Sequence, residues 1–260
     1  MLPLKDYNPT TTRSIIVPIL IGINVVVFFF LQPFSVGTTS REQVVKQVKF
    51  FTCNAAIPYE VAHGHNLAQS PPSDGGQDIQ QDIVVEKTFC PHKNVWLSML
   101  YTMFLHGSLL HIGGNMLFLW VFGNNIEDRL GRFRFVLFYL LCGLAATYAQ
   151  TLVSISSGAP QIGASGAIAG VLGAYIVLYP RARVRTLVFL FLIFFLDLPA
   201  YVLLGIWFLL QLLQGVGPAA TNGGVAYMAH VGGFIAGILL LAVFRPRPAP
   251  PPPPRYSLPY

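Results

Sequence analysis

Six long apolar runs recur along this chain, and they restrict its fold more than any other feature. A helix that crosses a bilayer needs roughly 20 consecutive apolar residues, and each run is close to that length. The runs cover about residues 14–34, 97–122, 134–154, 163–180, 198–214 and 226–244. Hydrophobic residues make up 54% of the sequence and charged residues only 10%, against about 25% charged in ordinary soluble domains, which excludes a soluble globular enzyme. We therefore expect an all-α integral membrane protein with six transmembrane helices.

The chain divides around these runs into three parts. Residues 1–13 form a short N-terminal segment, residues 14–244 hold the spans together with a long polar loop at 35–96, and residues 245–260 form a Pro-rich tail. The composition of the loop predicts little ordered structure and no core of its own. Consecutive prolines at 250–254 predict an extended polyproline helix, for which the sequence indicates no particular partner.

The stretch between residues 186 and 213 does not fit the pattern of single spans. It is too long for one span and too short for two, and Asp197 and Pro199 interrupt it. Because proline breaks or kinks a helix, we begin the fifth span near Pro199. We assign residues 187–196 to an interfacial or re-entrant segment.

Basic residues indicate how the spans are oriented. The formal charge of +6 comes from Lys and Arg that stand in twos and threes at the ends of the runs, which favours an orientation signal over a surface for nucleic acid. Those on one predicted side are Lys5, Arg13, Arg129, Arg132, Arg134, Arg181, Arg183, Arg185, Arg245, Arg247 and Arg255. The short loops 155–162 and 215–225 on the other side carry none. By the positive-inside rule, both termini are expected in the cytoplasm.

Polar side chains inside the runs are costly in a bilayer and therefore mark candidate functional groups. Ser165 lies near the start of the fourth span and His230 near the start of the sixth, while His111 and Asn115 lie in the second. In the predicted topology all four lie in the outer half of the membrane, which indicates a shared polar cavity that opens outward. Alone, each has an ordinary packing or hydrogen-bonding role, but together a hydroxyl and an imidazole supply the nucleophile and base for acyl transfer.

His111 and Asn115 are four residues apart and share one face of a helix. Their N–H groups could donate to the oxyanion that forms when a hydroxyl attacks a carbonyl. The same spacing suits hydrogen bonds that join the second span to a neighbouring helix, and spacing alone does not separate these two roles. His106 is five residues before His111 and points elsewhere, so we expect a structural role for it.

Glycines at small-xxx-small spacing explain how the fourth and sixth spans could approach each other. Gly166 and Gly170 lie in the fourth span, and Gly233 and Gly237 lie in the sixth. The second pair shares a helical face with His230. Close packing along these stripes would bring the imidazole toward the candidate nucleophile.

The chain has ten carboxylates, and none falls in the outer half of a predicted span. We therefore expect a Ser–His dyad without a third acid, unless the polar loop folds back over the cavity. No cofactor is expected. Metal chemistry is the main competitor, but the HExxH pattern of zinc proteases is absent and the Cys and His residues of the polar loop have irregular spacing, so no metal is expected. For Cys53 and Cys90 in that loop, free thiols are favoured over a disulfide.

Four motifs together make the chain resemble the rhomboid intramembrane serine proteases, with a loop pattern similar to bacterial members. The motifs are His106-Gly-Ser-Leu-Leu-His111-Ile-Gly-Gly-Asn115, Glu127-Asp-Arg129, Gly163-Ala-Ser165-Gly166 and Ala229-His230-Val-Gly-Gly233. The resemblance covers about residues 97 to 240, which is most of the predicted membrane domain.

The resemblance implies a bundle of six transmembrane helices in which Ser165 attacks a peptide carbonyl and His230 is the base. The Ser165 amide and the side chains of His111 and Asn115 would line the oxyanion hole. Gly163 would belong to a tight turn before the fourth span. Substrates would be single-span membrane proteins that are cleaved near the outer face of the bilayer.

The resemblance also assigns roles away from the dyad. Glu127 and Arg129 would form a structural polar pair, about residues 199–213 would be a lateral gate, and the loop 215–225 would be its cap. One departure concerns Ala169, which stands where many relatives carry an aromatic side chain that packs against the catalytic histidine. The packing around that histidine must therefore differ in this chain.

The expected partners are single-span membrane proteins and the lipid bilayer, with no nucleic acid. The expected location is a bacterial inner membrane, which the chain crosses several times. Two other functions are considered: a catalytically silent rhomboid-like protein that binds membrane proteins in the same groove, and a six-span transporter. Intact Ser165 and His230 argue against the first, and the lack of repeated broken helices or midplane charge pairs argues against the second.

Overall fold

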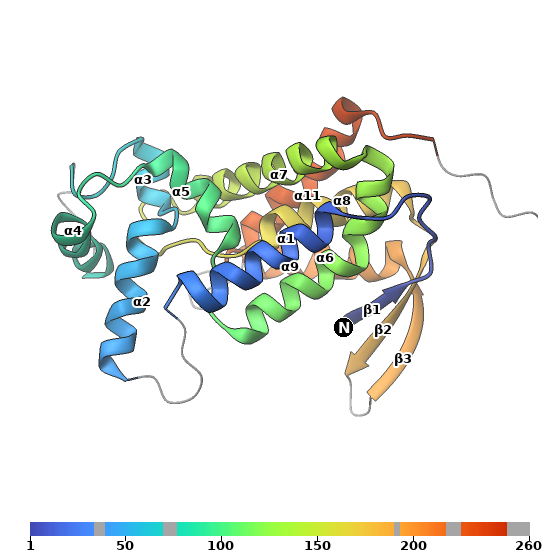
Figure 1. Cartoon of the computed structure of the whole chain (residues 1–260), viewed down its shortest axis with the longest axis horizontal. Helices are drawn as coiled ribbons and strands as arrows, with labels where there is room; N and C mark the ends of the chain where they lie inside the picture. The colour runs from blue at the N-terminus through green and yellow to red at the C-terminus, as the bar shows by residue number, and fades with distance from the viewer. Residues whose placement is uncertain (34–39, 70–76, 190–192, 217–224, 249–260) are drawn as a thin grey trace, which may run out of the picture.

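The computed structural model describes residues 1–33, 40–69, 77–189, 193–216 and 225–248. It contains a bundle of apolar helices, a smaller helical region at one end of the bundle and a three-stranded sheet beside the other end (Figure 1). The bundle consists of α1 (Ile16–Val26) with its π-helical continuation η1 (Val27–Leu31), α6 (Leu109–Leu130), α7 (Arg132–Val153), α8 (Ser165–Leu178), α9 (Ala200–Val216) and α11 (Tyr227–Phe244). Two short helices, α5 (Val95–Tyr101) and η2 (Thr102–Phe104), lead into it.

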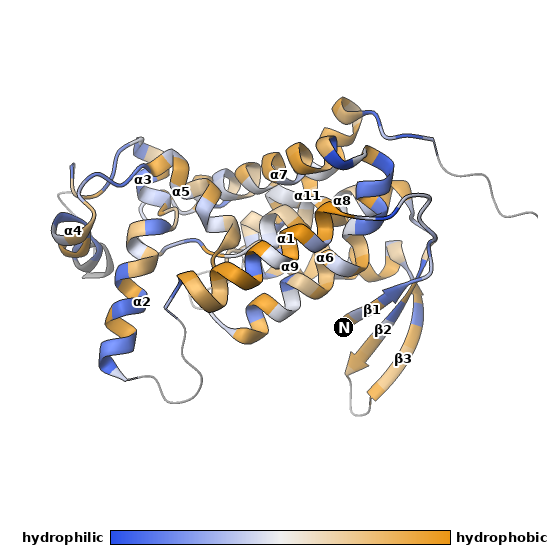
Figure 2. Cartoon of the chain, in the orientation of Figure 1, coloured by the Kyte–Doolittle hydropathy of each residue, from blue (hydrophilic) through white to orange (hydrophobic). Residues whose placement is uncertain are grey.

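Two described helices, α7 and α11, are long and apolar enough to cross a membrane. The pair Val95–Phe104 and Leu109–Leu130 would be a third span if it is read as one broken helix. Apolar helices shorter than 18 residues are Ile16–Leu31, α8 and α9. Figure 2 shows hydrophobic residues over most of the bundle and hydrophilic residues gathered on α2 and around the turn between α6 and α7. The protein is therefore mostly helical, with two or three spans by length, and the count of six stays a prediction.

The run at 97–122 does not form the single helix that was predicted. Its two helical parts meet at a bend of 83°. Ser108 causes the new start, because its Oγ accepts a hydrogen bond from the His111 amide at 3.1 Å and so caps α6. From there α6 continues beyond the predicted end to Leu130.

Residues 187–189 and 193–196 lie in two paired β-strands, which the sequence analysis did not anticipate. Strand β2 (Arg183–Phe189) pairs antiparallel with β3 (Ile193–Pro199) on one side and with β1 (Leu2–Asp6) on the other. Alternation explains β2, since Val184 is buried while its neighbours Arg183 and Arg185 are exposed. The expectation of an all-α protein is therefore wrong at this end of the molecule.

The polar loop at 35–96 is folded wherever it is described, contrary to the prediction. It contains α2 (Arg41–Asn54), α3 (Pro58–His63) and α4 (Gln77–Phe89). We call residues 40–69 and 77–94 of this loop the outer region, after the side of the membrane that the sequence analysis predicts for it. A disulfide joins Cys53 at the end of α2 to Cys90 just after α4, so the preference for free thiols was wrong.

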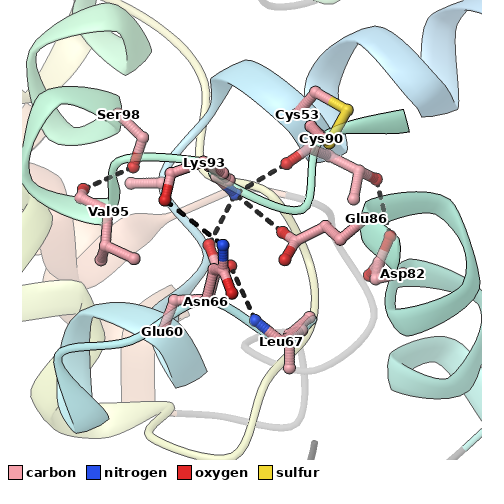
Figure 3. Close-up of polar contacts among 12 residues, drawn as sticks. Cys53, Glu60, Asn66, Leu67, Asp82, Glu86, Cys90, Lys93, Val95 and Ser98 are labelled. Carbon is pink, nitrogen blue, oxygen red and sulfur yellow. Dashed lines mark hydrogen bonds and ion pairs between the residues drawn. A yellow bond between two sulfur atoms is a disulfide. The ribbon is translucent and has the colours of Figure 1, made fainter. Parts of the chain in front are cut away.

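A buried lysine holds the outer region together (Figure 3). Lys93 Nζ donates to Glu60 Oε2 at 2.5 Å, to Glu86 Oε1 at 3.2 Å and to the Thr52 carbonyl oxygen at 2.7 Å. Burial raises the pKa of Glu60, and the positive charge of Lys93 opposes that rise. Removing one member of this cluster would leave an uncompensated buried charge. The cluster and the disulfide thus link α2, α3 and α4, beside small buried apolar clusters that include Val61 and Leu67.

The start of α1 is capped by a carboxylate from α6. Glu127 accepts hydrogen bonds from the backbone amides of residues 15–17 at 2.8 to 3.0 Å. These amides have no partner within their own helix, so the carboxylate satisfies them. The polar pair expected from the resemblance is not formed, because Arg129 Nε instead donates to the Arg247 carbonyl oxygen at 2.7 Å.

Candidate active site

Ser165 and His230 meet where α8 packs against α11. Ser165 Oγ lies 2.7 Å from His230 Nε2, which is hydrogen-bonding distance. Ser165 is the first residue of α8, and His230 lies in the first turn of α11. The structure thus brings together the two side chains that were predicted to act as nucleophile and base.

Glycine makes this close approach of the two helices possible. A Cβ added to Gly233 would overlap the carbonyl oxygen of Gly166, and one added to Gly237 would overlap the carbonyl oxygen of Gly170. Only glycine fits at such backbone contacts. The prediction that these stripes pack the fourth span against the sixth is confirmed.

Thr102 holds the segment of chain that leads to Ser165. Its Oγ1 donates to the Gln161 carbonyl oxygen at 2.8 Å and accepts from the Ala56 amide at 2.7 Å. Its carbonyl oxygen accepts from the Gly163 amide at 2.9 Å. The outer region is therefore bonded directly to the turn before the nucleophile, a link that the sequence pattern could not reveal because the partners are far apart in the chain.

His111 lies against the same turn. A Cβ added to Gly163 would be 2.7 Å from His111 Nε2 and 3.5 Å from Ser165 Oγ, so the imidazole is close to the candidate nucleophile. Gly163 also has φ of 125°, a backbone conformation that other residues rarely adopt. Space and conformation both require glycine here.

Asn115 points toward His106. Its Nδ2 lies 2.9 Å from His106 Nε2, and both side chains are buried. This hydrogen bond joins α6 to the turn just before it, whereas the predicted alternative was a bond to a neighbouring helix. The rings of His106 and His111 lie 5.1 Å apart, so the three side chains form one polar group beside the turn of Gly163.

The backbone of His106 is fixed by Gln32, which follows η1. Gln32 Nε2 donates to the His106 carbonyl oxygen at 2.5 Å, and Gln32 Oε1 accepts from the His106 amide at 3.1 Å. The side chain of His106 is fully buried. These contacts suit the structural role that was expected for this residue.

Gln211 is a residue of this site that the sequence analysis missed. Its Oε1 lies 2.6 Å from His230 Nδ1, and Trp207, one turn earlier on α9, has its ring 5.8 Å from the histidine ring. The aromatic neighbour of His230 thus comes from α9 and not from the position of Ala169. The two glutamines of the apolar run 198–214, Gln211 and Gln214, were the signal that could have drawn attention to this position.

The first turn of α11 is held by α7. Gln150 Oε1 accepts hydrogen bonds from the amides of Met228 at 3.1 Å and Ala229 at 3.2 Å. First-turn amides generally lack acceptors within their own helix, and the Ala229 amide also donates to the Ala226 carbonyl oxygen at 3.1 Å. The side chain of Gln150 therefore fixes the backbone directly before His230.

A small cavity of about 20 Å³ adjoins Ser165, and its polar lining includes Thr102, Thr147 and Gln161. A volume of this size holds about one water molecule when polar partners are present. A larger hollow of about 560 Å³ lies between β1 and α6, and its lining includes neither Ser165 nor His230. Across the described ranges, no three Cys, His, Asp or Glu side chains lie close enough together to hold a metal ion.

A family model described as the rhomboid domain matches residues 93–247, which is more than half of the chain. The chain belongs to the rhomboid family. Together with its apolar helices, this membership identifies the chain as a multi-pass integral membrane protein.

Several curated rhomboid relatives are similar to this chain. Rhomboid protein 1, mitochondrial, of Saccharomyces cerevisiae is 30% identical over 168 residues, which are 62% of this chain and 44% of that protein. Presenilin-associated rhomboid-like protein, mitochondrial, of Bos taurus is 35% identical over 108 residues, 40% of this chain and 29% of that protein. RHOMBOID-like protein 5 of Arabidopsis thaliana is 30% identical over 162 residues, 62% of this chain and 48% of that protein.

The match therefore spans less than half the length of each of these three relatives. All three come from eukaryotes, and two are named as mitochondrial. They give no support to the predicted likeness to bacterial rhomboids.

Proposed function

We propose that this rhomboid-family chain is an intramembrane serine endopeptidase that uses Ser165 and His230 as a catalytic dyad. The 2.7 Å separation between Ser165 Oγ and His230 Nε2 carries the proposal. A serine hydroxyl is a weak nucleophile unless a base accepts its proton, and the imidazole is within reach to do so.

The proposed reaction has two stages. Ser165 Oγ attacks the carbonyl carbon of the scissile peptide while its proton passes to His230 Nε2, and the carbonyl electrons move onto oxygen. The C–N bond then breaks, and the amine leaves with the proton from Nε2. In the second stage, a water attacks the acyl ester, gives a proton to Nε2 and releases the acid, and the proton returns to Ser165 Oγ. The small cavity beside Ser165 supplies a protein-lined place for that water.

The oxyanion would form beside the start of α8. Ser165 opens this helix, so its amide belongs to the first turn, where N–H groups have no intrahelical acceptor. His111 would donate from α6, because its Nε2 lies close to the turn of Gly163. Asn115 would join the oxyanion hole only by exchanging its hydrogen bond with His106 for one with the substrate.

The membrane arrangement is part of the proposal. The bundle would have six transmembrane segments, formed by α1 with η1 and by the five other helices of the bundle, with both termini in the cytoplasm. The Cys53–Cys90 disulfide supports this orientation, since it puts the outer region in an oxidising compartment while basic residues gather at the opposite ends of the helices. The bacterial inner membrane stays a prediction from the sequence.

The substrates would be single-span membrane proteins cleaved near the outer membrane face. Helix α9 would be the lateral gate through which they reach Ser165, and its side chains beyond Leu204 are largely half-buried or exposed. Most of the predicted cap, at 217–224, lies outside the described residues.

Cleavage of a fluorescent single-span substrate by purified protein in liposomes tests the proposal. The substrate carries small residues near its outer end, and wild type is compared with Ser165→Ala and His230→Ala. Exposed Ser156→Ala and His92→Ala serve as matched controls outside the site. We expect at least a 1000-fold loss of rate in the site variants and no change in the controls.

Cleavage by Ser165→Ala at the wild-type rate would overturn the assignment of the nucleophile. If wild type binds several single-span proteins without cutting them, the silent binding protein becomes the better explanation.

A further inference from the structure

We infer that Gln211 is a positioning residue for the catalytic base. Its amide oxygen holds the imidazole of His230 with the proton on Nδ1, so that Nε2 is left with a lone pair for the proton of Ser165. This inference rests on the proposed protease function, which it deepens by adding a third group to the dyad.

The hydrogen bonds of the imidazole carry the inference. His230 Nε2 lies 2.7 Å from Ser165 Oγ, and Nδ1 lies 2.6 Å from Gln211 Oε1. A neutral imidazole has one N–H, and the partner of one nitrogen decides which of them carries it. An amide oxygen only accepts, so Nδ1–H donates to Gln211 and Nε2 faces the hydroxyl as an acceptor. This is the tautomer that a general base for Ser165 requires.

An amide suits this position in a membrane protein. In the Ser-His-Asp arrangement an ionised carboxylate orients the histidine, but a charged carboxylate is expensive inside a bilayer. Gln211 lies on an apolar helix between Leu210 and Leu212, and its neutral amide does the same orienting task at a lower desolvation cost. The amide oxygen of Gln211 is the negative end of the amide dipole. It is directed at the imidazole of His230, which gains a positive charge during the reaction.

The same face of α9 makes a second contact with the base. Trp207 is four residues before Gln211, and its ring is tilted by 36° to the ring of His230 at 5.8 Å. Ala169 on α8 is too small to supply this contact. Helix α9 therefore restrains the imidazole through both its ring face and its Nδ1 atom.

Replacing Gln211 tests the inference. Gln211→Leu substitutes an apolar side chain of similar size and so removes the acceptor. Gln211→Glu keeps an acceptor oxygen, and Gln214→Leu makes the same change one turn further along α9. We expect Gln211→Leu to lower kcat by about 10- to 100-fold with KM unchanged, because the lost hydrogen bond matters most when the imidazole is charged. Gln211→Glu should recover most of the rate, and Gln214→Leu should match wild type.

The tautomer of His230 supplies a readout that a purely structural role would not change. Nitrogen-15 NMR of histidine-labelled protein, with His230→Ala to assign the signal, should show a protonated Nδ1 in wild type and a mixture of tautomers in Gln211→Leu. Equal melting temperatures of Gln211→Leu and Gln214→Leu would show that the fold is intact.

Two results would overturn the inference: a proton on Nε2 of neutral His230 in wild type, or Gln211→Leu kinetics equal to those of Gln214→Leu. Failure of the proposed protease function is distinguishable from this. It would show as undiminished cleavage by Ser165→Ala, whereas the NMR result does not depend on any substrate.

Discussion

Replacing Gly163 with alanine should damage the site in two separable ways. The new Cβ would lie 2.7 Å from His111 Nε2 and 3.0 Å from His111 Cε1, whereas unbonded heavy atoms of this kind rest at roughly 3.5 Å. The ring or the turn must therefore move by roughly 0.8 Å, and overpacking of this size costs about 1–3 kcal/mol. Holding alanine at φ of 125° adds about 1–3 kcal/mol of backbone strain.

A double-mutant cycle with His111→Ala separates the two costs. Without the imidazole the clash disappears, so adding Gly163→Ala in that background should cost only the strain. The difference between the two backgrounds is the clash, and we expect it to be about 1–3 kcal/mol in the free energy of unfolding.

Unfolding of the detergent-solubilised protein by denaturant measures these free energies, and the liposome assay measures cleavage. Because the displaced groups adjoin Ser165, we expect a loss of cleavage of about 100-fold in Gly163→Ala. Gly205→Ala is the control, since a Cβ at Gly205 meets nothing within 4 Å and should change stability by less than about 1 kcal/mol. Equal costs of Gly163→Ala with and without His111 would refute the proposed clash.

Two further predictions concern the ends of the molecule. Reduction of Cys53–Cys90, or its replacement by two serines, should destabilise the outer region by about 4 kcal/mol because the bond closes a loop with a sequence separation of 37 residues. Limited proteolysis between α2 and α4 measures this, and unchanged digestion rates would contradict it. Burial raises the pKa of Asp6 from 3.8 to about 6, so the fold prefers the protonated carboxyl, and about 3 kcal/mol of stability that is present below pH 4 is lost as the pH rises through 6. Asp6→Asn should remove most of this dependence, which melting temperatures at pH 4 and pH 7.5 would show; an unchanged difference between the two would argue against it.

The candidate dyad could be predicted because its signals are local. Ser165 and His230 are rare polar groups in apolar runs, and the stripes of Gly166 and Gly233 follow directly after them. Each signal depends only on neighbouring residues and on the cost of polar groups in a bilayer. The same reasoning would have marked Gln211 as a candidate functional group. Only the structure shows that its partner is the imidazole of His230.

The rest of the fold depends on contacts between distant parts of the chain. The N-terminal strand β1 exists only because β2, about 180 residues later, offers an edge to pair with. The outer region is stabilised by Lys93 with two glutamates and by a disulfide, so counting apolar residues underestimated its order. The bend before α6 falls at Ser108, whose side chain caps the new helix start, and the length of the apolar run alone did not indicate it.

The cap on α1 also affects the order in which the chain can be completed. The Ile15 amide and the Glu127 carboxylate that accepts its hydrogen bond are 112 residues apart. At 5–20 residues per second, the ribosome needs roughly 6 to 22 s to add that length of chain. Throughout this time the N-terminal helix is already made, yet the carboxylate that satisfies its first amides has not been synthesised. The start of α1 therefore lacks its cap until the ribosome has added Glu127.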